Sequence, residues 1–162
     1  NFVRKGIVRK GRPAYGCIHT FLPIYIPFGL RVRVAWPPRL STGLLQRWQG
    51  LRTQFSQDEI VAIIEPRTHT MSLGSLRNEL SHCCAPADRV IWFRGENINW
   101  DLSEVQKNCV IPATMLDKHD AIVSAILKHS SEAHASAKKR HVVIMSNGAF
   151  GGIYGKLTTQ LA

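Results

Sequence analysis

The sequence predicts an α/β fold, a mostly parallel sheet flanked by helices. Short, continuous apolar runs recur at 60–64, 90–93 and 142–145, and parallel strands that are covered on both faces need such runs. Segments with helical spacing of apolar residues separate these runs. Strands that alternate with helices favour parallel pairing through right-handed crossovers. The chain has 162 residues, of which 44% are apolar, which is enough for one packed domain.

The first helix of this pattern begins after Ser41, a residue type preferred at helix N-caps. Apolar residues then follow at helical spacing, which predicts a helix over 43–55: Leu44, Leu45, Trp48, Leu51 and Phe55. The apolar run that comes next predicts a buried strand over 59–64. A polar loop at 65–71 follows it, and 73–84 is predicted as a helix.

The second half repeats the alternation. A buried strand is predicted over 88–93, and Asp101 with Glu104 fits a capping box that opens a short helix. Val110 and Ile111 form a candidate short strand. Asp117 is expected to cap a helix that runs to about residue 133, and the last long strand is predicted over 141–145. A glycine-rich turn and a short apolar helix complete the described pattern.

The net charge of +10 is unevenly distributed along the chain. Residues 1–57 carry ten basic and no acidic residues, whereas residues 58–162 carry eleven of each. Three interpretations of the basic part stay open: an arm that binds nucleic acid or anionic lipid, a targeting segment, or a fragment edge or shifted reading frame. We therefore divide the chain into an atypical basic segment, 1–40, and a domain, 41–162.

Two polar loops follow predicted strands directly, and open α/β sheets bind ligands at the carboxyl ends of their strands. In the loop after residue 64, Arg67 is the first candidate, because a guanidinium can hold a phosphate or carboxylate through two parallel hydrogen bonds. A solvated loop arginine is the alternative. Thr68, His69 and Thr70 are candidate contacts to ribose or phosphate, although His69 is equally interpretable as a loop histidine without a chemical role.

In the loop after residue 145, Ser146, Asn147 and Gly148 are candidate binding residues, because an asparagine side chain can both donate and accept hydrogen bonds. A structural turn in which Asn147 caps the next helix is the alternative. Gly151 and Gly152 are expected to act through the backbone. Trp100 is expected to pack rather than to serve as a stacking platform.

Residues 58–162 resemble the C-terminal domain of the Mur ligases, and within that family the murein peptide ligases. The family pattern Glu-Pro-Arg-(Ser/Thr)-x-Thr-Met-x-x-Gly stands here at 65–74, Asn-Trp-Asp-Leu at 99–102, and Met-Ser-Asn-Gly-x-Phe-Gly-Gly-Ile at 145–153. Two departures occur: the family more often has Asn at the position of His69, and its Tyr-Asp-Asp-Phe-Ala-His-His-Pro segment is not found before Ser41. The resemblance implies a Rossmann-like sheet.

The resemblance also implies a reaction. In Mur ligases, ATP and Mg²⁺ convert the carboxylate of a UDP-sugar into an acyl phosphate, which the amine of an incoming amino acid or peptide attacks. For the murein peptide ligases these substrates are UDP-N-acetylmuramate and L-Ala-γ-D-Glu-meso-diaminopimelate, in bacterial, cytoplasmic peptidoglycan recycling. The family's C-terminal domain supplies nucleotide contacts and recognises the peptide, while ATP and Mg²⁺ are bound mainly by a central domain.

The sequence contains no Gly-x-x-Gly-Lys-(Ser/Thr) run, so we expect no ligase activity from this chain alone and assign it no catalytic residue and no metal ligand. The interpretation is a C-terminal domain fragment. A non-catalytic nucleotide- or peptide-binding module and a basic nucleic-acid-binding protein are the alternatives. Neither a nucleic-acid nor a membrane partner is expected. The four cysteines lack metal-ligand spacing, so reduced, structural thiols are expected.

Overall fold

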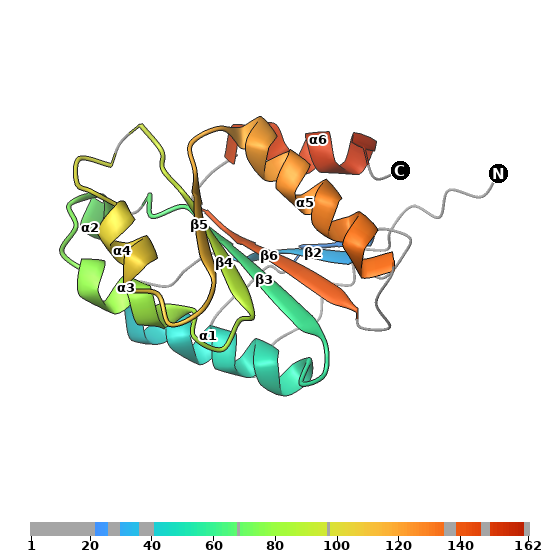
Figure 1. Ribbon diagram of the computed structural model, residues 1–162, viewed down its shortest axis with the longest axis horizontal. Helices are drawn as coiled ribbons and strands as arrows, with labels where there is room; N and C mark the ends of the chain where they lie inside the picture. The colour runs from blue at the N-terminus through green and yellow to red at the C-terminus, as the bar shows by residue number, and fades with distance from the viewer. Residues whose placement is uncertain are drawn as a thin grey trace.

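The computed structural model describes residues 22–25, 30–35, 41–67, 69–96, 98–134, 139–146 and 150–160. In this part of the chain the strands form one six-stranded sheet of order β1-β2-β6-β3-β4-β5 (Figure 1). The strand bounds are β1 Leu22–Tyr25, β2 Leu30–Ala35, β3 Glu59–Ile64, β4 Arg89–Phe93, β5 Ala113–Leu116 and β6 Arg140–Met145. β1 pairs antiparallel with β2, and the other neighbours pair in parallel. The predicted α/β class is confirmed.

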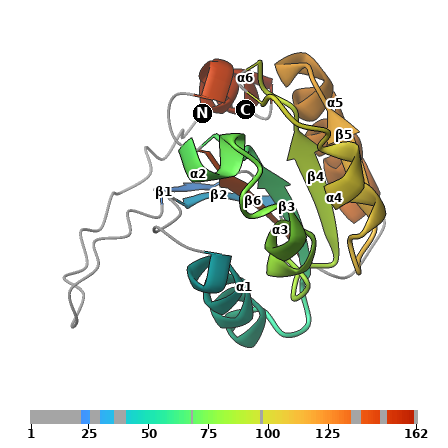
Figure 2. The same cartoon turned by 90° about the vertical axis from the view of Figure 1, so that its left-hand side faces the viewer.

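Helices cover both faces of the sheet (Figures 1 and 2). Their bounds are α1 Ser41–Gln54, α2 His69–Ser72, α3 Arg77–Cys83, α4 Ser103–Lys107, α5 His119–His134, the 3₁₀ turn η1 Phe150–Gly152 and α6 Ile153–Gln160. One core cluster joins α1, α3 and α4 to the sheet, and a second joins α5 and α6 to the opposite face. None of the helices in the described residues is both long and apolar enough to cross a membrane.

The strand sequences explain this three-layer arrangement. Successive side chains of a strand point to opposite faces. In β3, Ile60, Ala62 and Ile64 therefore belong to the first core cluster, while Val61 and Ile63 belong to the second. All five are at most 2% exposed. A strand that is buried on both faces has no polar alternation, which is why β3, β4 and β6 read as continuous apolar runs.

The order of connections places a switch point beside β6. The chain moves from β2 to β3, β4 and β5 in one direction and uses helices of one face, then returns through α5 on the other face to insert β6 between β2 and β3. Right-handed crossovers require this change of face when the direction reverses. The carboxyl ends of β3, β4, β5 and β6 consequently meet at one edge, with the reversal among them.

Several predicted elements agree closely with the structure. β3 spans Glu59–Ile64, as predicted, and α1, β4 and β6 begin within two residues of their predicted starts. Cys83, Cys84 and Cys109 form no disulfide among the described residues, and Cys17 lies outside them, so the reduced state stays a prediction.

Three local predictions were wrong. Val110 and Ile111 are not a strand; Val110 is 60% exposed, and β5 begins three residues later, at Ala113. The helix predicted over 73–84 is shorter, because the backbone turns at Gly74 (φ 72°) between α2 and α3. The capping box at Asp101 does not form: its carboxylate accepts hydrogen bonds from the backbone N–H (2.9 Å) and hydroxyl (2.6 Å) of Ser103 instead.

Part of the atypical basic segment belongs to the sheet. β1 and β2 both lie within residues 1–40, and β2 pairs in parallel with β6 along its whole length, from Leu30 opposite Arg140 to Ala35 opposite Met145. The family segment expected before Ser41 is absent from the sequence, yet a strand occupies the place beside β6.

Candidate functional site

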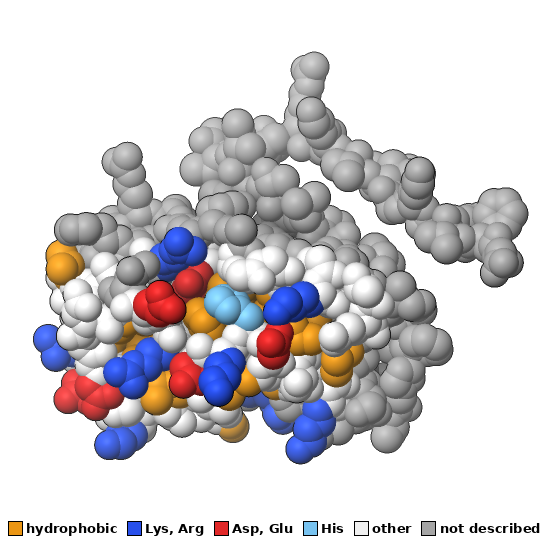
Figure 3. Space-filling model, turned by 90° about the horizontal axis from the view of Figure 1, so that it is seen from above, with side chains coloured by type: hydrophobic (Ala, Val, Ile, Leu, Met, Phe, Trp, Pro, Cys, Tyr) orange, Lys and Arg blue, Asp and Glu red, His pale blue; other side chains and the backbone are white. Residues whose placement is uncertain are grey.

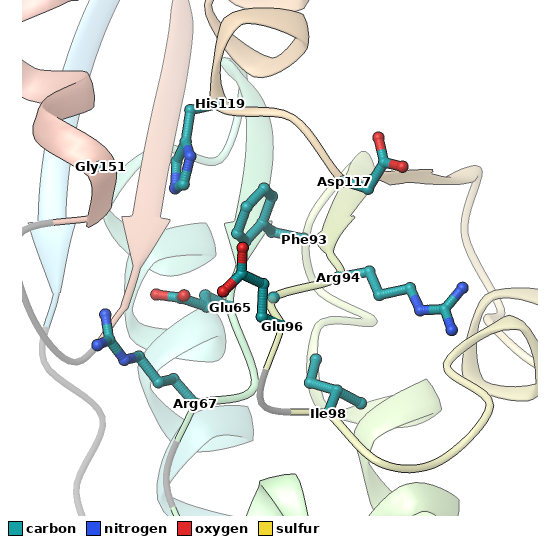
Figure 4. A pocket seen from close by; sticks show the side chains of 10 residues that line it. Glu65, Arg67, Phe93, Arg94, Glu96, Ile98, Asp117, His119 and Gly151 are labelled. Carbon is teal, nitrogen blue, oxygen red and sulfur yellow. The ribbon is translucent and has the colours of Figure 1, made fainter.

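A cavity of about 310 Å³ lies at the edge where the carboxyl ends of β3, β4, β5 and β6 meet. Each of these strands, or the loop that follows it, contributes to the walls (Figure 4). The lining residues are Glu65, Arg67, Phe93, Arg94, Gly95, Glu96, Ile98, Asp117, His119 and Gly151. The cavity thus occupies the position at which open α/β sheets bind their ligands.

Glu65 forms the floor of the cavity next to β6. Its backbone N–H donates to the carbonyl of Met145 (2.9 Å), which continues the β3–β6 pairing by one residue. Its side chain is only 9% exposed, and one carboxylate oxygen accepts a hydrogen bond from the hydroxyl of Ser146. The other oxygen lies against Gly95, where an added Cβ would be 3.5 Å away. A buried acidic group is thereby held in one orientation by its neighbours.

Arg67 is exposed and reaches the cavity from the end of β3. Its backbone N–H donates to the carbonyl of Glu65 (2.8 Å), which closes a tight turn directly after the strand. In Figure 4 the side chains of Arg67, Glu65, Glu96 and His119 surround one space, while the guanidinium of Arg94 points away from it. The cavity therefore offers a cation and two carboxylates to the same ligand.

His119 forms the wall on the α5 side. Its ring lies 4.5 Å from that of Phe93, in a tilted arrangement, and 5.2 Å from that of Phe150, edge to face. Phe93 and Phe150 are themselves in edge-to-face contact at 5.1 Å. Gly151 has φ 58°, and an added Cβ would lie only 2.6 Å from Cδ2 of His119. Only glycine fits here, because it combines a positive φ with close approach to the ring.

The sequence-predicted site residues are brought together in part. Arg67 and Gly151 line the cavity, Ser146 is 1% exposed and lies behind Glu65, and Gly152 is exposed without lining the cavity. Thr68, Asn147 and Gly148 lie outside the described residues. His69 and Thr70 begin α2, and their side chains are not described. The binding roles of all these residues stay predictions.

The lining residues that sequence reasoning missed follow β4 and β5. Glu96 lies three residues after β4, Asp117 directly follows β5, and His119 lies three residues after β5, at the start of α5. The rule that selected Arg67 and Ser146, a polar residue just after a strand, applies equally to them. For Asp117 and His119 it failed because the third predicted strand was assigned to 110–111, which placed Asp117 at a helix start and away from any strand end. Glu96 was not selected, although the strand before it was predicted.

Trp100 packs as predicted. Its indole N–H donates to the carbonyl of Met71 (2.9 Å), and its ring covers Gly74, where an added Cβ would lie 3.0 Å from Cγ. This contact holds the end of α2 and the turn after it against the segment that precedes α4.

Acidic and basic side chains are interspersed on the face that α5 and α6 cover, with apolar groups between them (Figure 3).

At the sheet edge opposite the cavity, where β3 and β6 begin, Nε of Arg140 donates to the carboxylate of Glu59 (2.6 Å) and Nε2 of His141 contacts that of Asp58 (2.8 Å). Arg140 and His141 are both buried, so these pairs are part of the folded core of that edge.

No family model matches the chain. Two curated relatives have the same name, UDP-N-acetylmuramate–L-alanyl-γ-D-glutamyl-meso-2,6-diaminoheptandioate ligase. The relative from Escherichia coli (strain K12) is 34% identical over 103 residues, which is 64% of this chain. The relative from Haemophilus influenzae is 30% identical over 102 residues, or 63% of this chain. In both cases the match spans 21% of the relative's own length.

Two solved structures are similar along most of this chain. A domain assigned to a UDP-N-acetylmuramate:L-alanyl-γ-D-glutamyl-meso-diaminopimelate ligase from Haemophilus ducreyi has a TM-score of 0.60 and 32% identity, and the match covers 87% of this chain and 98% of that one. A murein peptide ligase from Psychrobacter arcticus has a TM-score of 0.69 and 28% identity, covering 86% of this chain and 29% of that one.

Proposed function

The chain belongs to the Mur ligase family, as a relative of the murein peptide ligases, and from this premise we propose that its cavity binds the peptide L-Ala-γ-D-Glu-meso-diaminopimelate. The peptide is the nucleophile in an ATP-dependent ligation to UDP-N-acetylmuramate. The names of the relatives support this pair of substrates. The proposal concerns the recognition step, which residues of this chain can carry out.

The observation that carries the proposal is the charge pattern of the cavity. A meso-diaminopimelate residue at the end of a peptide carries an ammonium group and carboxylates close together. Arg67 can pair with a carboxylate through two parallel hydrogen bonds, and Glu65 and Glu96 can accept hydrogen bonds from an ammonium group. A cavity of about 310 Å³ lies at the lower end of the range for small-molecule sites and can accept the diaminopimelate head group.

In the proposed reaction the peptide amine attacks an acyl phosphate of UDP-N-acetylmuramate, and phosphate leaves as the amide forms. Holding the peptide in one orientation lowers the entropic part of this barrier. The proposal does not extend to the binding of ATP and Mg²⁺. The described residues gather no group of His, Cys, Asp or Glu that could hold a metal ion, and the 162 residues contain no P-loop sequence. The role proposed for this chain is therefore confined to the peptide.

Isothermal titration of the 162-residue chain with the tripeptide tests the proposal. We expect binding of the tripeptide and much weaker binding of L-Ala-γ-D-Glu, which lacks the diaminopimelate head. Arg67→Gln should weaken tripeptide binding by about tenfold to a hundredfold, the range expected when a hydrogen bond to a charged group is lost. The matched control is Lys107→Gln. Lys107 is exposed on α4 and does not line the cavity, so this substitution removes one positive charge away from the site.

The outcomes separate the alternatives. If the wild-type chain does not bind the tripeptide, or if Arg67→Gln binds it as tightly as wild type does, the proposal is wrong. Binding of ATP without binding of the tripeptide would favour the nucleotide-binding module. Retention on DNA that weakens steeply with salt would favour a nucleic-acid partner for the basic segment.

A further inference from the structure

We propose that His119 contacts the peptide directly, with a ring N–H donating a hydrogen bond to a carbonyl or carboxylate oxygen of the ligand. The inference rests on the function proposed above and assigns a specificity-determining role in that site to a residue outside the family motifs quoted for this chain. Three observations support it. The ring is fixed by its aromatic neighbours, its nitrogens make no hydrogen bond within the described residues, and the backbone of Gly151 lies close to it.

The ring of His119 is held in place before any ligand binds. Phe93, which is 3% exposed, and Phe150, which is 1% exposed, contact it at 4.5 Å and 5.2 Å between ring centroids. The two phenylalanines also contact each other, so the three rings form one cluster. Aromatic pairs at these distances are attractive and restrict ring rotation. The position of the imidazole is therefore set by the fold and needs no rearrangement upon binding.

The polar edge of this ring is available for a ligand. Within the described residues, the contacts of His119 are the two aromatic ones and a charge interaction with Asp120, and no hydrogen bond to either ring nitrogen is present. The residue is half-buried and lines the cavity rather than the outer surface. An imidazole that packs on its faces and leaves its nitrogens toward a cavity can donate to a ligand oxygen. Figure 4 shows the ring directed at the space between Glu65, Glu96 and Arg67.

Gly151 connects the ring to the loop after β6. Its backbone passes so close that any side chain would overlap the imidazole, at 2.6 Å from Cδ2 and 2.7 Å from Nε2. The ring is thus enclosed by the ends of three strands, β4 through Phe93, β5 through its own position and β6 through Gly151. A ligand that reaches Arg67 and Glu65 enters the same space as the imidazole nitrogens.

The decisive variant is His119→Phe, which keeps an aromatic ring among Phe93 and Phe150 and removes both nitrogens. We expect it to retain the wild-type urea midpoint of unfolding and to bind the tripeptide roughly fivefold to thirtyfold more weakly. His119→Gln retains an N–H donor and should recover part of the affinity. His82→Phe, an exposed histidine on α3, is the matched control and should bind as wild type does.

A second measurement responds to contact with the ligand and would not respond to a packing role. In wild-type chain labelled with ¹⁵N at histidine, the ring-nitrogen chemical shifts of His119 should change when the tripeptide is added, and those of His82 should not. Equal affinity of wild type and His119→Phe, or unchanged His119 shifts at saturating tripeptide, overturns the role of His119 while leaving the proposed function intact. Absence of tripeptide binding to the wild type overturns both.

Discussion

Gly151→Ala should destabilise the fold, and the structure allows the cost to be separated into a conformational and a steric part. The first part is conformational. At φ 58° an alanine occupies the left-handed region, which costs an L-residue about 1–2 kcal/mol. The second part is steric: the new Cβ would lie 2.6 Å from Cδ2 of His119, far inside contact distance.

The steric part has a defined consequence for packing. To accommodate the Cβ, the imidazole must move away from Phe93 and Phe150, and aromatic pairs of this kind contribute about 0.5–1.5 kcal/mol each. Overpacking of folded cores costs about 1–3 kcal/mol in general. The total expected loss for Gly151→Ala is therefore about 2–5 kcal/mol.

Gly152→Ala is the matched control. Gly152 has φ 69°, and an added Cβ would meet nothing within 4 Å, so this variant should lose the conformational part alone, about 1–2 kcal/mol. The assay is urea unfolding followed by tryptophan fluorescence, with the free energy extrapolated to water. In a double-mutant cycle, Gly151→Ala introduced into His119→Ala should cost no more than Gly152→Ala does. Equal costs for the two glycine variants, or an excess cost at Gly151 over Gly152 that persists without the His119 ring, would refute the reasoning.

Three further predictions concern side chains elsewhere in the fold. Glu59→Gln should destabilise the fold by about 2–3 kcal/mol, because it leaves the guanidinium of Arg140, 8% exposed, without its carboxylate; Glu104→Gln, from an exposed pair with Arg77 at 3.9 Å, should change the unfolding free energy by less than about 0.5 kcal/mol. Trp100→Phe should cost about 1 kcal/mol in the same assay, since the hydrogen bond to Met71 is lost while the ring remains over Gly74. Contact with Cys109 lowers the pKa of the Cys84 thiol, but contact with Cys83 and burial outweigh it, so the pKa is raised well above its ordinary value; contact with Cys84, then burial, raises that of Cys109 likewise. At pH 8 both should resist iodoacetamide in the folded chain and react in urea, as peptide mass spectrometry would reveal, and equal labelling in both states would contradict this.

The layered fold could be predicted from the sequence because doubly buried strands have a composition that few other elements share. The run from Ile60 to Ile64 predicted β3 with its observed bounds, and Val142 to Met145 predicted most of β6. At such positions every side chain meets a helix on one face or the other. Burial on both faces can therefore be predicted from the local sequence.

The elements that failed are those whose structure depends on tertiary contacts. β5 lies at the edge of the sheet, and its residues are half-buried or exposed, so Ala113–Leu116 lacks the apolar run that identifies a central strand. Val110 and Ile111 have strand-forming side chains but lie in a turn. The break between α2 and α3 follows from the fit of Gly74 beneath Trp100, a contact between residues that are far apart in the sequence. Local propensity does not encode such a contact.

The same distinction explains the candidate site. A loop after a buried strand can be located from sequence, which is how Arg67 and Ser146 were selected. The direction of each side chain depends on the side chains that the neighbouring strand places beside it. Ser146 follows β6, and because β6 pairs with β3 in parallel, its hydroxyl lies beside Glu65 and donates to that carboxylate. Ser146 therefore orients an acidic group of the cavity and does not itself line it. The residues that line the cavity include His119, which lies at the start of α5, shortly after the edge strand β5. A strand that the sequence did not reveal thus positions the residue on which peptide specificity is proposed to depend.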